Sequence, residues 1–284
     1  MILIKIISVI FGIIPDPVVM FLARLFHPIF YRALKKGKWG LKAARIIPRV
    51  FKDKDRNWHD RVISQNALHL AKFTGEIFQA RFKTRKGGFK KIVIGNGKEY
   101  LETLIESGSG FIIVTCHLGN WEYGAAYIAG AYRNLYAPVF MINSKANRAL
   151  NWMRSGWGVY LLGTRYDPRT SAMTFFKMRD LLNHGEIIFL VADQEALGGD
   201  LKGKLFGKKI KIFSGPFILG QKTKKPFLPM YTLRDERNRI VINFEEPFYM
   251  KEGNMDQDID RIMNFFERHI SVNPEQYIWS QERW

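Results

Sequence analysis

The sequence contains a single cysteine, Cys116, among its 284 residues. One thiol can form neither a disulfide within the chain nor a metal cage built from several cysteines. A chain of this length buries most of the surface that it exposes when unfolded, so a hydrophobic core is enough to hold the fold. Cys116 precedes His117, and neighbouring residues in extended backbone face opposite ways, so we expect a small buried residue here and not a nucleophile.

Acidic residues are also scarce, since 26 Asp and Glu stand against 44 Lys and Arg and leave a net charge of +18. Such an excess predicts an anionic partner: nucleic acid, an acidic membrane surface or a phosphorylated substrate. The excess is concentrated in residues 32–91, with 18 basic and 4 acidic residues, and in residues 200–226, with 8 and 1. We expect no nucleic-acid partner, because no reader motif is present and the first basic segment adjoins an apolar segment.

The chain lacks an uninterrupted apolar run of the roughly 20 residues that a membrane-spanning helix requires. Its apolar N-terminus is interrupted by Lys5 and by Pro15-Asp16-Pro17. A cleavable signal peptide is one alternative, but no small-residue cleavage site follows. We predict that residues 1–31 are a membrane anchor of two short helices, inserted in or lying on the bilayer. Residues 32–91 would be a basic helical region beside anionic lipid on the cytoplasmic side. A buried helical hairpin with a solvated basic face is the other alternative.

From about residue 90 onward, short apolar runs alternate with helical patterns. Strands are expected at 90–94, 111–115, 137–142, 158–162, 186–191, 227–231 and 240–244, and helices at 98–106, 121–131, 146–155, 168–183, 214–223 and 256–271. This alternation predicts an α/β fold with a mostly parallel central sheet flanked by helices. No linker interrupts residues 92–284, which we interpret as one domain.

His117 and Glu122 follow the predicted strand 111–115, and ligands gather at the carboxyl ends of strands in open α/β sheets. A histidine is suited to act as a general base near neutral pH, and a carboxylate can orient its ring. On one helix the two side chains would lie about 140° apart. The pair therefore requires His117 in the loop and Glu122 in the first helical turn, with a bend that Gly119 permits. The alternative is a histidine satisfied by a backbone carbonyl and a surface glutamate.

Several motifs in sequence order resemble the lipid A biosynthesis late acyltransferases, of the lauroyl and myristoyl type, in the His-x4-Asp/Glu acyltransferase superfamily. The resemblance covers roughly residues 90–284, and the N-terminal anchor is in its usual place. His117-Leu-Gly-Asn-Trp-Glu122 is similar to the family's catalytic box. The other matching segments are residues 147–154, 158–165, 178–194, 206–209, 214–217 and 274–279.

The resemblance implies a glycerolipid-acyltransferase-like fold and an enzyme on the cytoplasmic face of the bacterial inner membrane. Such an enzyme moves a fatty acyl chain from a thioester of the acidic acyl carrier protein, or of coenzyme A, to a hydroxyl of a lipid A precursor. It uses no cofactor or metal. His117 would take the proton from that hydroxyl, and Glu122 would orient His117 and stabilise its charge. Backbone N–H groups near residues 119–122, or an arginine, would bind the oxyanion.

Four further residues are implied as substrate-binding residues. Arg154 and Arg165 match arginines of the second block and would bind substrate phosphate, although both could be ordinary surface arginines. Asp193 ends a buried apolar run, where it needs a partner such as Arg165 or caps the next loop. Gln194 rests on the resemblance alone.

Two other functions stay open from the sequence. The acceptor could be a different glycolipid or a lysophospholipid, because the shape of the acceptor pocket cannot be read from the sequence. The chain could also be a membrane-surface binding protein without catalysis.

Overall fold

The structure, a computed structural model, describes residues 2–37, 42–83, 91–132, 134–141, 145–165, 167–193 and 199–279. Seven strands form one sheet in the order β1-β9-β8-β2-β5-β3-β4. Their bounds are β1 Ile92–Ile94, β2 Phe111–Thr115, β3 Leu135–Phe140, β4 Val159–Thr164, β5 Ile187–Val191, β8 Phe227–Arg234 and β9 Ile240–Phe244. Within the described residues, neighbouring strands are parallel except for β8 and β9. The predicted α/β fold with a mostly parallel sheet is confirmed.

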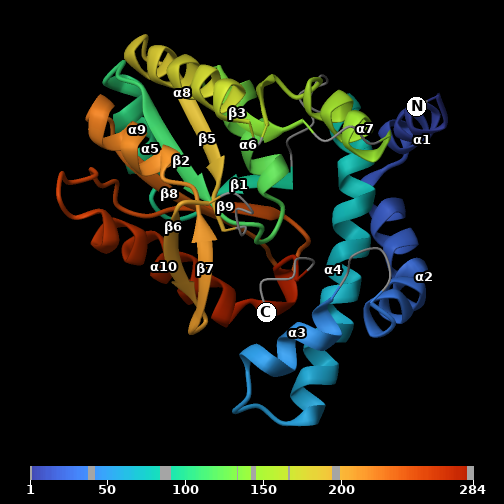
Figure 1. Cartoon of the computed structure of the whole chain (residues 1–284). Helices are drawn as coiled ribbons and strands as arrows, with labels where there is room; N and C mark the ends of the chain where they lie inside the picture. Colours follow the sequence, from blue (N-terminus) through green and yellow to red (C-terminus); the bar gives the residue numbers. More distant parts are fainter. Residues whose placement is uncertain are drawn as a thin grey trace.

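Helices lie on both faces of this sheet (Figure 1). Their bounds are α5 Lys98–Glu106, α6 Trp121–Ala131, α7 Lys145–Arg154, α8 Pro168–Asn183, α9 Gly215–Thr223 and α10 Met255–Val272. In β2, Phe111 and Ile113 pack in the core that contains α5 and α6, whereas Ile112 and Val114 pack in the core that contains α8, α9 and α10. The strand is apolar on both faces because each face is covered.

Two more strands, β6 (Leu201–Leu205) and β7 (Lys208–Ile212), form a separate antiparallel hairpin. Its inner face includes the buried residues Leu205 and Ile210 and packs on α10. The sequence does not predict this hairpin, because lysines occupy the alternate positions and weaken the apolar signal.

At the N-terminus, α1 (Ile2–Ile13) and α2 (Asp16–Lys35) pack along the long helix α4 (Arg56–Lys83) (Figure 1). The short helix α3 (Ala43–Val50) lies between α2 and α4 in the sequence. The predicted break into two helices at Pro15 is confirmed, and the second helix extends beyond residue 31. The outward faces of α1 and α2 are largely apolar, although Lys5 and Arg24 are also exposed there. The large apolar residues that are 44–78% exposed are Ile6, Val9, Ile10, Ile13, Val18, Phe21, Leu25, Phe26 and Ile29. No helix in the described part of the chain is both long and apolar enough to cross a membrane.

His69 on α4 provides a test of how α4 packs, because its side chain is buried with only 4% of its surface exposed. Burial lowers the pKa of His69 from its ordinary value of 6.5 to about 3. As the pH falls below 6.5, His69 therefore binds a proton in the unfolded chain but stays neutral in the folded chain. We expect the free energy of unfolding to decrease on acidification by up to about 1.4 kcal/mol per pH unit from this residue.

The measurement is urea unfolding of the wild type and of His69→Leu between about pH 7.5 and about pH 4.5. The variant should lose less stability over this range than the wild type does. Identical pH dependence in the two proteins would show that His69 is not held neutral in the fold.

Candidate active site

His117 and Asp193 come together because they follow neighbouring parallel strands. Thr115 of β2 lies opposite Val191 of β5, and the Ala192 N–H continues the ladder by donating to the Thr115 carbonyl at 2.9 Å. His117 and Asp193 each lie two residues beyond that last pair. The distance between His117 Nδ1 and Asp193 Oδ1 is 2.7 Å.

Asp193 is fully buried, and Tyr277 holds its second oxygen. The Tyr277 hydroxyl donates to Asp193 Oδ2 at 2.7 Å, and Tyr277 is itself only 2% exposed. Each oxygen of this carboxylate thus has a hydrogen-bond partner, which a buried charge requires. Tyr277, Asp193 and His117 form a continuous chain of hydrogen bonds that includes the ring of His117, whose side chain is 16% exposed.

The backbone around His117 is held by residues 276–278, at the end of the 3₁₀ turn η4 (Pro274–Gln276) and just beyond it. The Ile278 N–H donates to the His117 carbonyl at 3.0 Å, and the Gly119 N–H donates to the Gln276 carbonyl at 2.9 Å. Gly119 has a positive φ of 64°, and a Cβ there would lie 2.0 Å from the Thr232 carbonyl oxygen. Only glycine fits at this bend, as the sequence pattern predicts.

Glu122 lies in the first turn of α6, as predicted, but its carboxylate holds Arg154. Arg154 Nε lies 3.0 Å and 3.1 Å from the two carboxylate oxygens, and Nη2 also donates to Oε1. Asp193, and not Glu122, is therefore the carboxylate on Nδ1 of His117, which differs from the predicted orienting role of Glu122. A two-pronged ion pair also fixes the plane of the Arg154 guanidinium.

Arg165 is not part of this chain of contacts among the described residues. Arg165 is exposed just after β4, and its carbonyl accepts a hydrogen bond from the Ser171 hydroxyl at 2.8 Å. The partners found for Asp193, namely His117 and Tyr277, differ from the predicted partner Arg165. Gln194 lies outside the described residues.

Beneath the loop, a buried ion pair joins α4 to the sheet. Glu76 contacts Arg234 of β8, and their side chains are 2% and 5% exposed. Asn120 connects this pair to the site, because its Nδ2 donates to Glu76 Oε2 at 2.8 Å and its Oδ1 accepts from the Tyr123 N–H at 3.0 Å. The last contact caps α6. No local sequence signal indicates these contacts, which join residues up to 158 positions apart.

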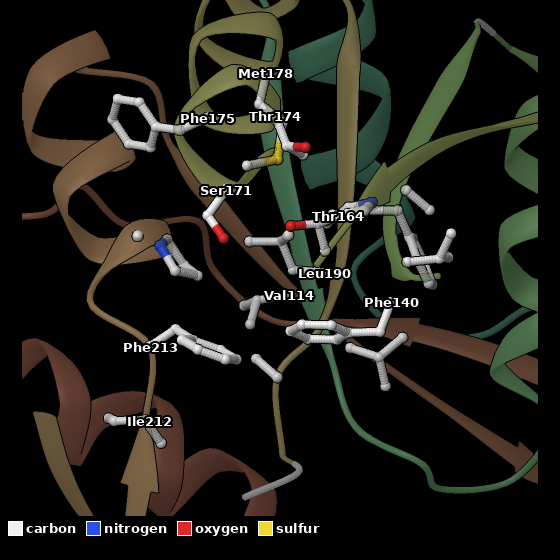
Figure 2. A pocket seen from close by; sticks show the side chains of 18 of the residues that line it. Val114, Phe140, Thr164, Ser171, Thr174, Phe175, Met178, Leu190, Ile212 and Phe213 are labelled. Atoms are coloured by element: carbon white, nitrogen blue, oxygen red, sulfur yellow. The ribbon is translucent and has the colours of Figure 1, made fainter. Parts of the chain in front are cut away.

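A cavity of about 1180 Å³ opens at the carboxyl ends of the strands, and its walls include His117, Glu122 and Arg154. Most of its remaining lining is apolar. Figure 2 shows side chains from β2, β3, β5 and α8 around the hollow. The labelled residues are Val114, Phe140, Thr164, Ser171, Thr174, Phe175, Met178, Leu190, Ile212 and Phe213.

The site thus combines a histidine whose ring is oriented by a buried carboxylate with a fixed arginine and a large apolar cavity. This combination suits proton transfer next to a hydrophobic ligand. Among the described residues, no group of three or more His, Cys, Asp or Glu side chains is placed to hold a metal ion.

Residues 2–284 match the family model for bacterial lipid A biosynthesis acyltransferases. No curated protein matches the chain. The family match spans nearly the whole chain and includes α1 to α4 as well as the sheet.

Proposed function

The chain belongs to the bacterial lipid A biosynthesis acyltransferase family and is an enzyme that transfers acyl groups, and from its site we propose a specific reaction. The acyl chain moves from a thioester, carried by acyl carrier protein, to a hydroxyl of a lipid A precursor. The observation that carries this proposal is the His117–Asp193 pair at the wall of a large apolar cavity.

His117 is the general base. Its Nδ1 is engaged by Asp193, so Nε2 is the nitrogen that takes the proton from the acceptor hydroxyl. The hydroxyl oxygen attacks the thioester carbonyl, and the C–S bond of the resulting tetrahedral intermediate then breaks. The imidazolium returns its proton to the departing sulfur. The buried Asp193 carboxylate stabilises the imidazolium during these steps, and Tyr277 keeps that carboxylate in position.

Arg154 and the first turn of α6 are the candidates for binding the oxyanion. The Gly119 N–H already donates to Gln276 and the Tyr123 N–H to Asn120. The backbone N–H groups of Trp121 and Glu122 are therefore the candidates at the positive end of the helix dipole. Glu122 occupies one edge of the Arg154 guanidinium. The opposite edge, with Nη1, is the part that contacts a substrate oxygen. In this account Glu122 fixes Arg154, and the exposed Arg165 is available for an acceptor phosphate.

The cavity holds the acyl chain. Its volume of about 1180 Å³ exceeds the range of about 300–1,000 Å³ typical of small-molecule pockets. Phe175 and Met178 of α8 and Leu190 of β5 supply apolar surface along it. A flexible hydrocarbon chain fits such a lining because it needs no hydrogen bonds.

The reaction is tested with purified wild-type protein, two donors and two acceptors. The donors are acyl groups on acyl carrier protein and on coenzyme A, and the acceptors are a lipid A precursor and a lysophospholipid. Mass spectrometry identifies the product. We expect an acylated lipid A precursor, formed fastest from acyl carrier protein. Acylation of the lysophospholipid alone would show that a lysophospholipid, and not a lipid A precursor, is the acceptor. Vesicle binding without transfer to either acceptor would overturn the enzymatic proposal.

We also propose that the enzyme works on the cytoplasmic face of the inner membrane and is attached there by the outward faces of α1 and α2. Replacing Phe21 and Leu25, which are 65% and 62% exposed, with aspartate should weaken binding to anionic vesicles at least about 10-fold, because apolar burial drives such attachment. Co-sedimentation with vesicles measures this. Val272→Asp, at a 76% exposed residue of α10, is the control, and equal binding by both variants would contradict the assignment.

A further inference from the structure

The outer face of the hairpin β6–β7 carries four lysines in two cross-strand pairs. Lys202 lies opposite Lys211, and Lys204 lies opposite Lys209. All four are exposed. Like charges directly opposite each other destabilise a hairpin, so this arrangement is unfavourable for the isolated chain.

The charge of these lysines is not neutralised within the part of the chain that the structure describes. Asp200, at the base of the hairpin, binds the backbone N–H and the hydroxyl of Ser214 at 2.9 Å and 2.6 Å. Glu267 of α10 accepts a hydrogen bond from the Phe206 N–H at 2.6 Å. Asp200 and Glu267 therefore bind other groups, and no ion pair is found for the four lysines among the described residues.

The direction in which the lysines point is fixed by packing on the other face. Gly203 faces Ile259 and Met263 of α10, since a Cβ at this glycine would lie 3.4 Å from each of them. Leu205 and Ile210 are buried in the same core. A shift of one residue in register would bury the lysines and expose this apolar set, so the outward lysine face is strongly specified.

The hairpin is also connected to the cavity. Ile212, the last residue of β7, lines the cavity together with Phe213 and Ser214. Asp200 ties the start of the hairpin to the same wall through Ser214. A partner bound to the lysine face is therefore placed next to the cavity that takes the acyl chain.

We propose that the four-lysine face of β6–β7 is the docking surface for the acidic carrier protein that delivers the acyl thioester. This inference rests on the proposed function. A protein fits the face better than a membrane does, because the outer side chains of the hairpin are lysines without an exposed large apolar residue. The hairpin is also well separated from the apolar faces of α1 and α2 (Figure 1). Opposite charge on the carrier offsets the lysine repulsion and speeds association.

The test uses full-length protein in which Lys202, Lys204, Lys209 and Lys211 are all changed to glutamate. Two further variants change the same four lysines to glutamine or to arginine. A fourth variant, Lys177→Glu/Lys222→Glu, alters exposed lysines of α8 and α9. Affinity for fluorescently labelled acyl carrier protein is measured by anisotropy. Transfer is measured from the acyl carrier protein and from an uncharged acyl-pantetheine thioester.

We expect the glutamate variant to bind the carrier at least about 10-fold more weakly and to show a matching rise in KM for this donor. Its kcat and its KM for acyl-pantetheine should change less than about twofold. The glutamine variant should show a smaller loss, and the arginine and Lys177/Lys222 variants should bind as the wild type does. Added salt should weaken wild-type binding more than variant binding.

Unchanged carrier affinity in the glutamate variant would overturn the inference. Reduced vesicle binding with unchanged carrier affinity would identify the face as a membrane contact instead. Equal losses with both donors would mean that the cavity is disturbed and would also count against docking. If the wild type transfers from neither donor, the proposed function fails, whereas the anisotropy measurement still decides whether the carrier docks on this face.

Discussion

Replacing His117 with alanine is expected to lower kcat for acyl transfer by about 10²–10⁴-fold, because general base catalysis by a positioned side chain contributes this much. The side chain lies at the cavity wall and its Nδ1 is held at 2.7 Å by Asp193. With only 16% of the ring exposed, bulk water has little access to replace it as a base. KM for the donor should change much less than kcat, because the ring acts mainly in the transition state.

The measurement is steady-state transfer from acyl carrier protein to a lipid A precursor, with circular dichroism to verify the fold. His184→Ala is the matched control. His184 is exposed after α8, and its Nδ1 contacts the Asp180 carbonyl at 2.7 Å. This control should retain wild-type kcat. If the His117→Ala enzyme also retains wild-type kcat, His117 is not the general base.

The second large effect concerns stability. Glu76→Gln should lower the free energy of unfolding by about 3–5 kcal/mol, because it leaves Arg234 with a buried and uncompensated charge. Glu76 and Arg234 are 2% and 5% exposed, and Glu76 also accepts the hydrogen bond from Asn120. Since Asn120 caps α6 directly after the His117 loop, the variant should also lose activity below its unfolding temperature.

Urea unfolding at neutral pH measures this effect. In the double variant Glu76→Met/Arg234→Met both charges are removed together, and much of the stability should return. Glu102→Gln, which breaks the exposed pair between Lys98 and Glu102 on α5, should leave stability almost unchanged. A Glu76→Gln protein as stable as the Glu102→Gln protein would contradict the buried pair.

The sequence predicts the sheet well because buried parallel strands leave short apolar runs with clear ends. β2 and β9 have the predicted bounds, and so do α5, α6 and α8. It does not predict which strands are neighbours. β2 and β5 are adjacent although β3 and β4 lie between them in sequence, so the sequence pairs His117 with the nearby Glu122 and not with Asp193.

The contacts of Tyr277 illustrate the same limit. The segment 274–279 resembles a family motif, yet Asn273 as a cap and Pro274 at the first position also indicate a plain helix start. Only the fold brings the Tyr277 hydroxyl to Asp193, 84 residues away, and the Ile278 N–H to His117. The lysine-rich hairpin is not predicted for a different reason, since lysines at the alternate positions leave it without the continuous apolar run that marks the buried strands of the sheet.

The central claim, that His117 and Asp193 act as one catalytic unit, is tested most directly by a double-mutant cycle. The measurement is single-turnover acyl transfer by the wild type, His117→Ala, Asp193→Asn and the double variant. We expect Asp193→Asn alone to lower the rate by about 10²–10⁴-fold. The double variant should be scarcely slower than His117→Ala, because the effects of residues that act as one unit are not additive. Wild-type transfer by Asp193→Asn, or fully additive losses in the double variant, would contradict the central claim.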